Sequence, residues 1–181
     1  MSTPVLILPG FGNSDPQHWQ SLWEQANPGF ERVRQHDWNN PVCAEWMAVL
    51  EGAAQRAGPE AILVAHSLYC LVVAHWATQQ HAPIKGALLV AVPDPDSQIF
   101  PREAIGFSTV PVQPFAFKSI VVASTDDPYG TTEYAGHLAR AWGSHFVSVG
   151  ACGHINGNSG IGTWPEGYAL LNKLNSSRIS K

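Results

Sequence analysis

The hydrophobic positions of the chain fall into short continuous runs, separated by longer segments in which apolar residues recur every three or four positions. Runs typical of β-strands lie at residues 5–8, 33–36, 62–65, 87–92, 120–123 and 145–149. Segments with helical spacing lie between most of these runs, at residues 16–26, 43–57, 68–80, 131–142 and 165–174. Because the strands are apolar throughout rather than at every second position, we expect both of their faces to be buried.

Alternating strands and helices predict an α/β fold, a three-layer α/β/α sandwich around a mainly parallel, doubly wound sheet of six strands. We expect the strand order 2-1-3-4-5-6, which puts the switch point of the sheet between the first and third strands. Ligands bind such sheets at the carboxyl ends of the strands. The loop after the first strand and the turn after the third strand are therefore predicted to face each other across a crevice.

Composition limits the partners. The 181 residues are 45% hydrophobic and 13% charged without a linker-like stretch, which predicts one domain over residues 1–181. The net charge of −4 and the lack of Lys or Arg runs argue against nucleic acid or an anionic membrane as partners and favour a small neutral substrate. No window approaches the ~18 apolar residues of a membrane span. The amino terminus lacks a basic leader, and Cys43, Cys70 and Cys152 fit reduced thiols, so we expect a cytoplasmic protein. The sequence makes no prediction of an oligomeric state.

The third apolar run leads directly into a serine, Ser67, and then into a helical pattern. This is typical of a nucleophile elbow, in which a sharp strand-to-helix turn exposes the serine hydroxyl. The usual motif has glycines two positions before and after the serine, where this chain has Ala65 and Tyr69. The Tyr69 ring either points to solvent or the cleft and narrows the substrate pocket, or it displaces the elbow. His66, beside the serine, is expected to line the pocket.

The loop after the first strand contains Gly10, Phe11 and Gly12, which allow a tight turn and free N–H groups. A dinucleotide fingerprint is excluded because its third glycine position holds Asp15, and no Walker Lys-Ser/Thr follows. With the elbow opposite, the amides of Phe11 and Leu68 are candidates for an oxyanion hole, and both glycines would border the substrate. The alternative is a plain tight turn.

Two further segments supply an acid and a base. Asp126 and Asp127 end the fifth strand, and their carboxylates must point in different directions, so only one can reach an imidazole. We favour Asp127, and expect Asp126 to cap a helix or shape a turn. His154 lies in a glycine-rich loop after the last strand and is the candidate general base. The chain order Ser67, Asp127, His154 is that of α/β-hydrolases. A metal site at Cys152 and His154 lacks further ligands, so no metal is predicted.

Residues 93–118 interrupt the alternation with aromatic residues and five prolines. The segment follows the fourth strand and is long enough for a flap over the site. We expect Phe100 and Phe107 to help form an acyl pocket. The alternative is an irregular segment that covers the edge of the sheet.

Several motifs together resemble the small serine hydrolases related to retinoblastoma-binding protein nine. The matching positions are residues 8–12 with Trp19 and Trp23, 65–68, 124–129, 153–156 and 159–167. The resemblance implies a compact α/β-hydrolase fold without a large cap, a triad of Ser67, Asp127 and His154, and hydrolysis of small carboxylic esters. The chain departs from that family at Tyr69, where glycine is usual.

The predicted function is therefore acyl transfer to water: a serine esterase that forms an acyl-enzyme on Ser67 and needs no metal or organic cofactor. Two alternatives stay open at this level. One is a hydrolase-fold binding or scaffold protein whose elbow is disabled by Tyr69. The other is a peptidase or amidase that uses the same triad.

Overall fold

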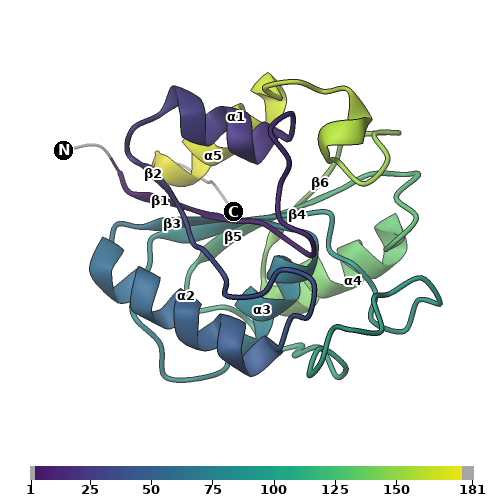
Figure 1. Ribbon diagram of the computed structural model, residues 1–181, viewed down its shortest axis with the longest axis horizontal. Helices are drawn as coiled ribbons and strands as arrows, with labels where there is room; N and C mark the ends of the chain where they lie inside the picture. Colours follow the sequence, from purple (N-terminus) through teal and green to yellow (C-terminus); the bar gives the residue numbers. More distant parts are fainter. Residues whose placement is uncertain (1–2, 177–181) are drawn as a thin grey trace.

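A six-stranded, entirely parallel sheet runs through the middle of the protein (Figure 1), in the computed structural model, which describes residues 3–176. Its strand order is β2-β1-β3-β4-β5-β6, which confirms the predicted order. The strands are β1 (Val5–Leu8), β2 (Phe30–Arg32), β3 (Ile62–His66), β4 (Gly86–Val90), β5 (Lys118–Ala123) and β6 (His145–Ser148).

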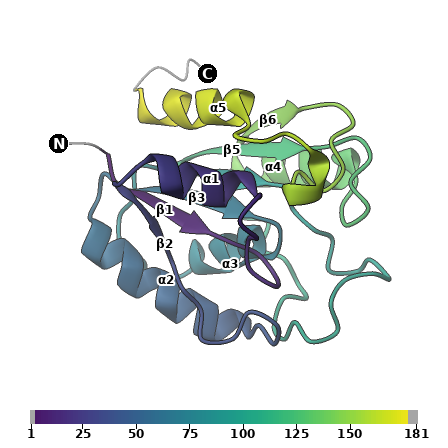
Figure 2. The same cartoon turned by 45° about the horizontal axis from the view of Figure 1, so that its top comes forward.

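Helices cover both faces of the sheet, which makes the predicted three layers. Two helices, α1 (Trp19–Ala26) and α5 (Pro165–Asn175), lie over one face, as Figures 1 and 2 show. Three helices lie over the other face: α2 (Cys43–Ala57), α3 (Leu68–Trp76) and α4 (Thr132–Trp142). A short 3-10 helix, η1 (Gly157–Ser159), follows β6. Across residues 3–176, no helix combines the length and the hydropathy that a membrane crossing needs.

The core is divided by the sheet into two apolar clusters, and alternate residues of each strand belong to different clusters. In β3, Leu63 and Ala65 pack with α2, α3 and α4, whereas Ile62 and Val64 pack with α1 and α5. All four are fully buried. This burial on both faces explains why the strand sequences are apolar throughout.

The second strand differs from its prediction. The sequence favoured residues 33–36, but the ladder with β1 pairs Phe30 to Arg32, and only the amide of Val33 continues it, with a hydrogen bond to Ile7 O at 2.9 Å. The hydrophobic pattern was misleading because β2 is an edge strand. Its residues are exposed or only half-buried, so they do not form an apolar run.

The segment between β4 and β5 packs against α2 rather than extending the sheet. Its residue Ile105 exchanges hydrogen bonds with the start of α2, accepting from Cys43 N at 2.9 Å and donating to Pro41 O at 2.9 Å. Phe107 fills the core on the α2, α3 and α4 side and is 1% exposed. The two predicted pocket residues of this segment therefore differ: Phe107 packs in the core, and Phe100 reaches the site described next.

Candidate active site

Ser67 lies on the turn between β3 and α3, with φ 55° and ψ −126°. A positive φ is costly for a residue with a side chain and is kept only where the surroundings enforce it. Here Ser67 N donates to Val90 O and Ser67 O accepts from Cys70 N, both at 2.9 Å. These bonds tie the turn to β4 and to α3, and the hydroxyl is held at the carboxyl edge of the sheet.

The loop after β1 packs closely against this turn at Gly10. A Cβ at this position would lie 2.9 Å from both His66 O and Ser67 Cβ, and 3.3 Å from Leu68 N. Only glycine therefore allows the two segments to approach in this way. The approach brings the following amide, that of Phe11, next to the elbow.

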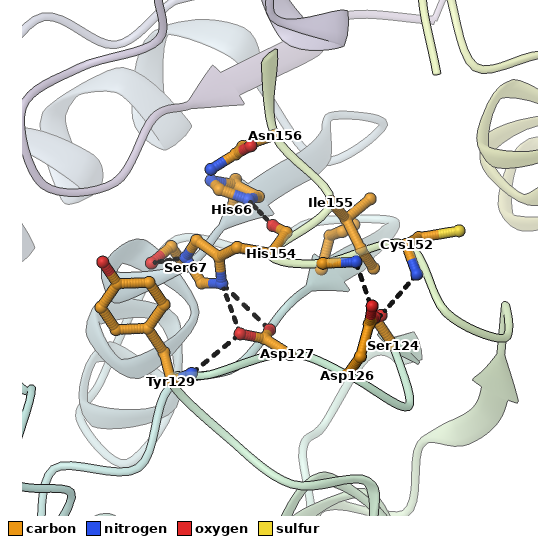
Figure 3. Close-up of polar contacts among 12 residues, drawn as sticks. His66, Ser67, Ser124, Asp126, Asp127, Tyr129, Cys152, His154, Ile155 and Asn156 are labelled. Carbon is orange, nitrogen blue, oxygen red and sulfur yellow. Dashed lines mark hydrogen bonds and ion pairs between the residues drawn. The ribbon is translucent and has the colours of Figure 1, made fainter. Parts of the chain in front are cut away.

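Ser67, His154 and Asp127 form a continuous hydrogen-bonded chain (Figure 3). Ser67 Oγ lies 2.7 Å from His154 Nε2, and His154 Nδ1 lies 2.9 and 3.0 Å from the two carboxylate oxygens of Asp127. Because a carboxylate only accepts, the imidazole proton is on Nδ1 and Nε2 accepts from the serine. The Asp127 side chain is 2% exposed and also accepts from Tyr129 N at 2.9 Å. The Tyr129 ring packs on the imidazole with 4.5 Å between the centroids.

Asp126 points away from this chain and holds the loop that carries His154. Its Oδ1 accepts from Ser124 Oγ and from Gly153 N, both at 2.7 Å, and Ser124 Oγ accepts from Cys152 N at 2.9 Å. These hydrogen bonds, first that from Ser124, lower the pKa of Asp126. The expectation that Asp126 caps the next helix is wrong, because α4 is capped by Thr131, whose Oγ1 accepts from Tyr134 N at 3.1 Å. Of the two expected roles of Asp126, only the shaping of a turn remains, through its hydrogen bonds with Ser124 and Gly153.

His66 contacts the same loop from the other side. Its Nε2 donates to His154 O at 2.9 Å, and its ring lies between those of His154 and His18, with centroids 4.9 and 4.7 Å away. Burial, with the neighbouring histidines, lowers the pKa of His66 well below its usual range, and burial lowers the pKa of His18 to about 4. Both rings are therefore neutral near pH 7. His18 also caps α1, accepting from Gln20 N at 3.1 Å through Nδ1.

Two backbone amides beside Ser67 are available to a ligand. In the first loop, Gly12 N donates to Trp38 O at 2.9 Å and Asn13 N donates to Gly10 O at 3.1 Å. Among residues 3–176, the backbone hydrogen bonds that lie outside helices and strand ladders include none donated by Phe11 N or Leu68 N. The two N–H groups belong to separate segments that meet beside Ser67, which makes them candidates for an oxyanion hole.

The serine and the histidine open into a small cavity of about 200 Å³. Its apolar lining comes from the first loop, the elbow, the segment after β4 and the β5–α4 loop: Phe11, Leu68, Pro93, Phe100, Pro101 and Tyr129. Its polar lining comes from Asn13, Asp15, His18, His66 and Asn156. The sequence pointed to Phe11, Leu68, His66 and Phe100. It missed the others because they lie on irregular segments or at a helix cap, where periodicity carries no information on contacts.

Four predicted pocket residues do not line this cavity. Gly12 lies on the outer side of its loop, Phe107 is buried below Phe100, and Tyr69 is fully buried in the core. The Tyr69 ring packs against Trp46 with 5.2 Å between centroids, and its hydroxyl accepts from Gln35 Nε2 at 2.7 Å. The ring thus points between α3 and α2, so it neither narrows the cavity nor displaces the elbow. Gly10 contacts the elbow without being part of the lining.

The arrangement is suited to nucleophilic acyl chemistry, since it joins a nucleophile, a base, an acid that orients the base, and two amide donors. Within the described part of the chain, no three His, Cys, Asp or Glu side chains are grouped so that they could hold a metal ion.

Comparisons with known proteins agree with this chemistry. A protein of Pectobacterium atrosepticum described as a YdeN-like hydrolase is 30% identical, with a TM-score of 0.84 over 95% of this chain and 90% of that one. The ydeN gene product of B. subtilis is 20% identical, with a TM-score of 0.74 over 97% of this chain and 100% of that one. A thermophilic esterase of Thermogutta terrifontis is 16% identical, with a TM-score of 0.70 over 97% of this chain and 92% of that one.

The similarities to the B. subtilis and Thermogutta terrifontis proteins show a shared fold alone. No curated protein sequence matches the chain significantly. The family model for serine hydrolases matches residues 5–173, which is nearly the whole chain, and the chain therefore belongs to the serine hydrolase family.

Proposed function

We propose that the protein hydrolyses small carboxylic esters through an acyl-enzyme on Ser67. The observation that supports this most directly is the hydrogen bond of 2.7 Å between Ser67 Oγ and His154 Nε2, continued to Asp127 by bonds of 2.9 and 3.0 Å. A serine hydroxyl is a weak nucleophile unless a base removes its proton as it attacks. The three side chains provide that base and fix its tautomer.

In the proposed reaction, Ser67 Oγ forms a bond to the ester carbonyl carbon while its proton passes to His154 Nε2. The Phe11 and Leu68 amides hold the oxyanion, each such donor contributing about 3 kcal/mol to the transition state. The alcohol leaves with the proton from His154. Water then attacks the acyl group, returns a proton through His154 to Ser67, and the carboxylic acid leaves. Asp127 stays ionised and stabilises the imidazolium.

The size of the cavity supports small substrates. About 200 Å³ is below the ~300–1,000 Å³ usual for sites that hold drug-sized ligands. Phe100 and Tyr129 would contact apolar parts of the substrate. The closer relation to the hydrolases related to retinoblastoma-binding protein nine belongs to this proposal and is supported by the motifs around Ser67, Asp127 and His154. A cytoplasmic location, supported by the free thiols of Cys43 and Cys70, is also proposed.

The alternative of a binding protein with a disabled elbow loses its sequence support, because the Tyr69 ring is buried away from Ser67. The proposal also favours esters over amides as substrates. A matched pair, p-nitrophenyl acetate and p-nitroacetanilide, measures this preference directly. Turnover of the anilide at a rate comparable to that of the ester would instead make the protein an amidase.

A fluorophosphonate probe tests the proposal. We expect the wild-type protein to be labelled, and Ser67→Ala to remain folded but unlabelled and inactive on p-nitrophenyl acetate. Ser176→Ala, which changes an exposed serine at the end of α5, is the matched control and should be labelled like the wild type. Folded wild-type protein that is neither labelled nor active would contradict the proposal.

A further inference from the structure

The loop that carries His154 is closed internally by a hydrogen bond from Ile155 N to Cys152 O at 3.1 Å, and it contains strained backbone. Gly150, Gly153 and Ile155 all have positive φ, of 74°, 54° and 47°. Such conformations are costly for a residue like isoleucine and persist only when neighbouring groups impose them. The position of the imidazole therefore depends on contacts made from outside the loop.

Ser124 and Asp126 supply these contacts on the β5 side. Ser124 is fully buried, and its hydroxyl accepts from Cys152 N while donating to Asp126 Oδ1. The same carboxylate oxygen accepts from Gly153 N at 2.7 Å, so two consecutive loop amides are bound just before His154 (Figure 3). Charge-assisted bonds of this kind are among the stronger hydrogen bonds in proteins.

The same stretch of chain also carries the acid that orients the ring. Asp127 follows Asp126 directly in the turn after β5, and the two carboxylates point in different directions. Asp126 therefore binds the backbone before His154, while Asp127 binds its Nδ1. The backbone after the histidine is bound from the other side, by His66 and by Trp19, whose Nε1 donates to Ile155 O at 2.8 Å.

We propose that Ser124 and Asp126 are positioning residues for the reaction, which place His154 against Ser67 by binding the amides of Cys152 and Gly153. The inference rests on the proposed function, because it assigns these two residues a part in ester hydrolysis. Neither residue lines the cavity, so neither touches the substrate. Displacement of a reacting group by about 1 Å can lower a rate about 10²-fold.

Three variants separate positioning from charge and from stability. Asp126→Ala removes both acceptor bonds. Asp126→Asn keeps an oxygen that can accept from Ser124 and Gly153 but removes the negative charge. Ser124→Ala removes the bond to Cys152 N and leaves that amide without its acceptor. Because Asp126 is exposed, its variants are expected to fold even if Ser124→Ala does not.

We expect Asp126→Ala and Ser124→Ala to lower kcat about 10- to 100-fold with KM changed less than about twofold, and Asp126→Asn to stay within about threefold of the wild type. The matched control is Glu51→Ala. Glu51 also binds a loop amide and a side chain, those of Ala82 and Trp76, but outside the cavity. The Glu51→Ala substitution should lower the melting temperature of the protein without lowering kcat.

A second measurement does not depend on activity. The His154 Nδ1 proton, bound to Asp127, should give a downfield proton resonance in ¹⁵N-histidine-labelled protein. We expect it to be lost or shifted in Asp126→Ala and retained in Asp126→Asn and Glu51→Ala. If the wild type gives the resonance and the variants change it as expected, but the wild type hydrolyses no ester, only the proposed function is contradicted. Folded Asp126→Ala that keeps both the resonance and the wild-type kcat would overturn the positioning role.

Discussion

Tyr69, at the position where the nucleophile-elbow motif usually has glycine, packs in the core away from Ser67. The side chain enters the core between α3 and α2, where Trp46 covers the ring and Gln35 binds the hydroxyl. Tyr69 lies in the first turn of α3 on the side that packs against α2, so its ring has space away from the serine. A motif read one residue at a time overstates the cost of such a change.

Replacing Tyr69 by Phe should therefore affect stability and not specificity. The change leaves the buried Gln35 Nε2 without its acceptor, which costs about 1–3 kcal/mol in the free energy of unfolding. The ratio of kcat/KM for p-nitrophenyl acetate and p-nitrophenyl butyrate should not change. Urea denaturation and steady-state kinetics measure the two quantities. A changed acyl preference would show that the residue acts on the pocket after all.

The buried histidine His18 should make the protein less stable in acid. Its pKa is about 4 in the folded state and about 6.5 when unfolded, so below pH 6.5 the unfolded chain binds the additional proton. Stability is fully present above pH 6.5 and is lost as the pH falls toward 4, by about 2 kcal/mol between pH 7 and pH 5.

The variant His18→Asn tests this contribution. Asparagine can accept from Gln20 N and keep the cap of α1, but it does not titrate. The loss of unfolding free energy between pH 7 and pH 5 should be about 2 kcal/mol smaller than in the wild type, while the contribution of His66 remains in both proteins. Equal losses in the two proteins would mean that the pKa of His18 does not differ between the folded and unfolded states.

At the scale of elements, the segment between β4 and β5 combines two roles in one irregular stretch. Phe107 is buried in the core, whereas Phe100 is half-buried and lines the cavity, with 6.5 Å between the two ring centroids. The sequence grouped both as pocket residues. Nothing in their spacing separates them, because an irregular segment has no fixed period that would assign side chains to a face.

These two phenylalanines form a matched pair for mutagenesis. Phe107→Ala should destabilise the fold by about 3–5 kcal/mol through loss of buried surface and formation of a cavity. Phe100→Ala should cost less stability and should raise KM for butyrate esters more than for acetate esters, since it removes a wall of the pocket. Thermal unfolding and kinetics on both esters distinguish the two changes. Equal effects of the two variants on KM would refute the assignment of Phe100 to the pocket and of Phe107 to the core.

Strand and helix patterns predicted the strands that are buried on two faces and failed at one of the two edges. The strands β1, β3, β4 and β5 lie within a few residues of their expected positions, because burial requires apolar side chains there. The edge strand β6 also lies at its expected position, although its residues are mostly exposed. The edge strand β2 lacks that requirement and was misplaced. For the site, the order of Ser67, Asp127 and His154 along the chain and the residues of the loops around them predicted these three side chains. The bonds of Ser124 and Asp126 to backbone amides have no sequence period and could be found only from coordinates.

For the molecule as a whole, the charges around the cavity should select among substrates. Among the residues that the structure describes, no Lys or Arg lines the cavity. Asp15 lines it and accepts a hydrogen bond from Gln17 N at 2.7 Å. Arg32, near the same loop, is already paired with Glu24 at 2.8 Å. A carboxylate on the acyl group would be desolvated without a partner and repelled by Asp15.

We therefore expect the mono-p-nitrophenyl ester of succinic acid to be hydrolysed with a kcat/KM at least about tenfold below that of p-nitrophenyl butyrate at low salt. Added salt should narrow the difference, because it screens the charge of an exposed carboxylate. The Asp15→Asn substitution should further narrow the difference in kcat/KM between the two esters. Equal rates for the two esters in the wild type would contradict this account of the cavity.

The parallel arrangement has a consequence for when activity can arise during synthesis. Ser67 follows β3, Asp127 follows β5 and His154 follows β6, so the hydrogen bonds among them exist only once β6 has joined the sheet. A nascent chain still lacking its last strand holds a strained serine with no partner to activate it. Ribosome-bound intermediates should consequently be chemically silent, and the gain of reactivity toward a covalent probe would report completion of folding itself.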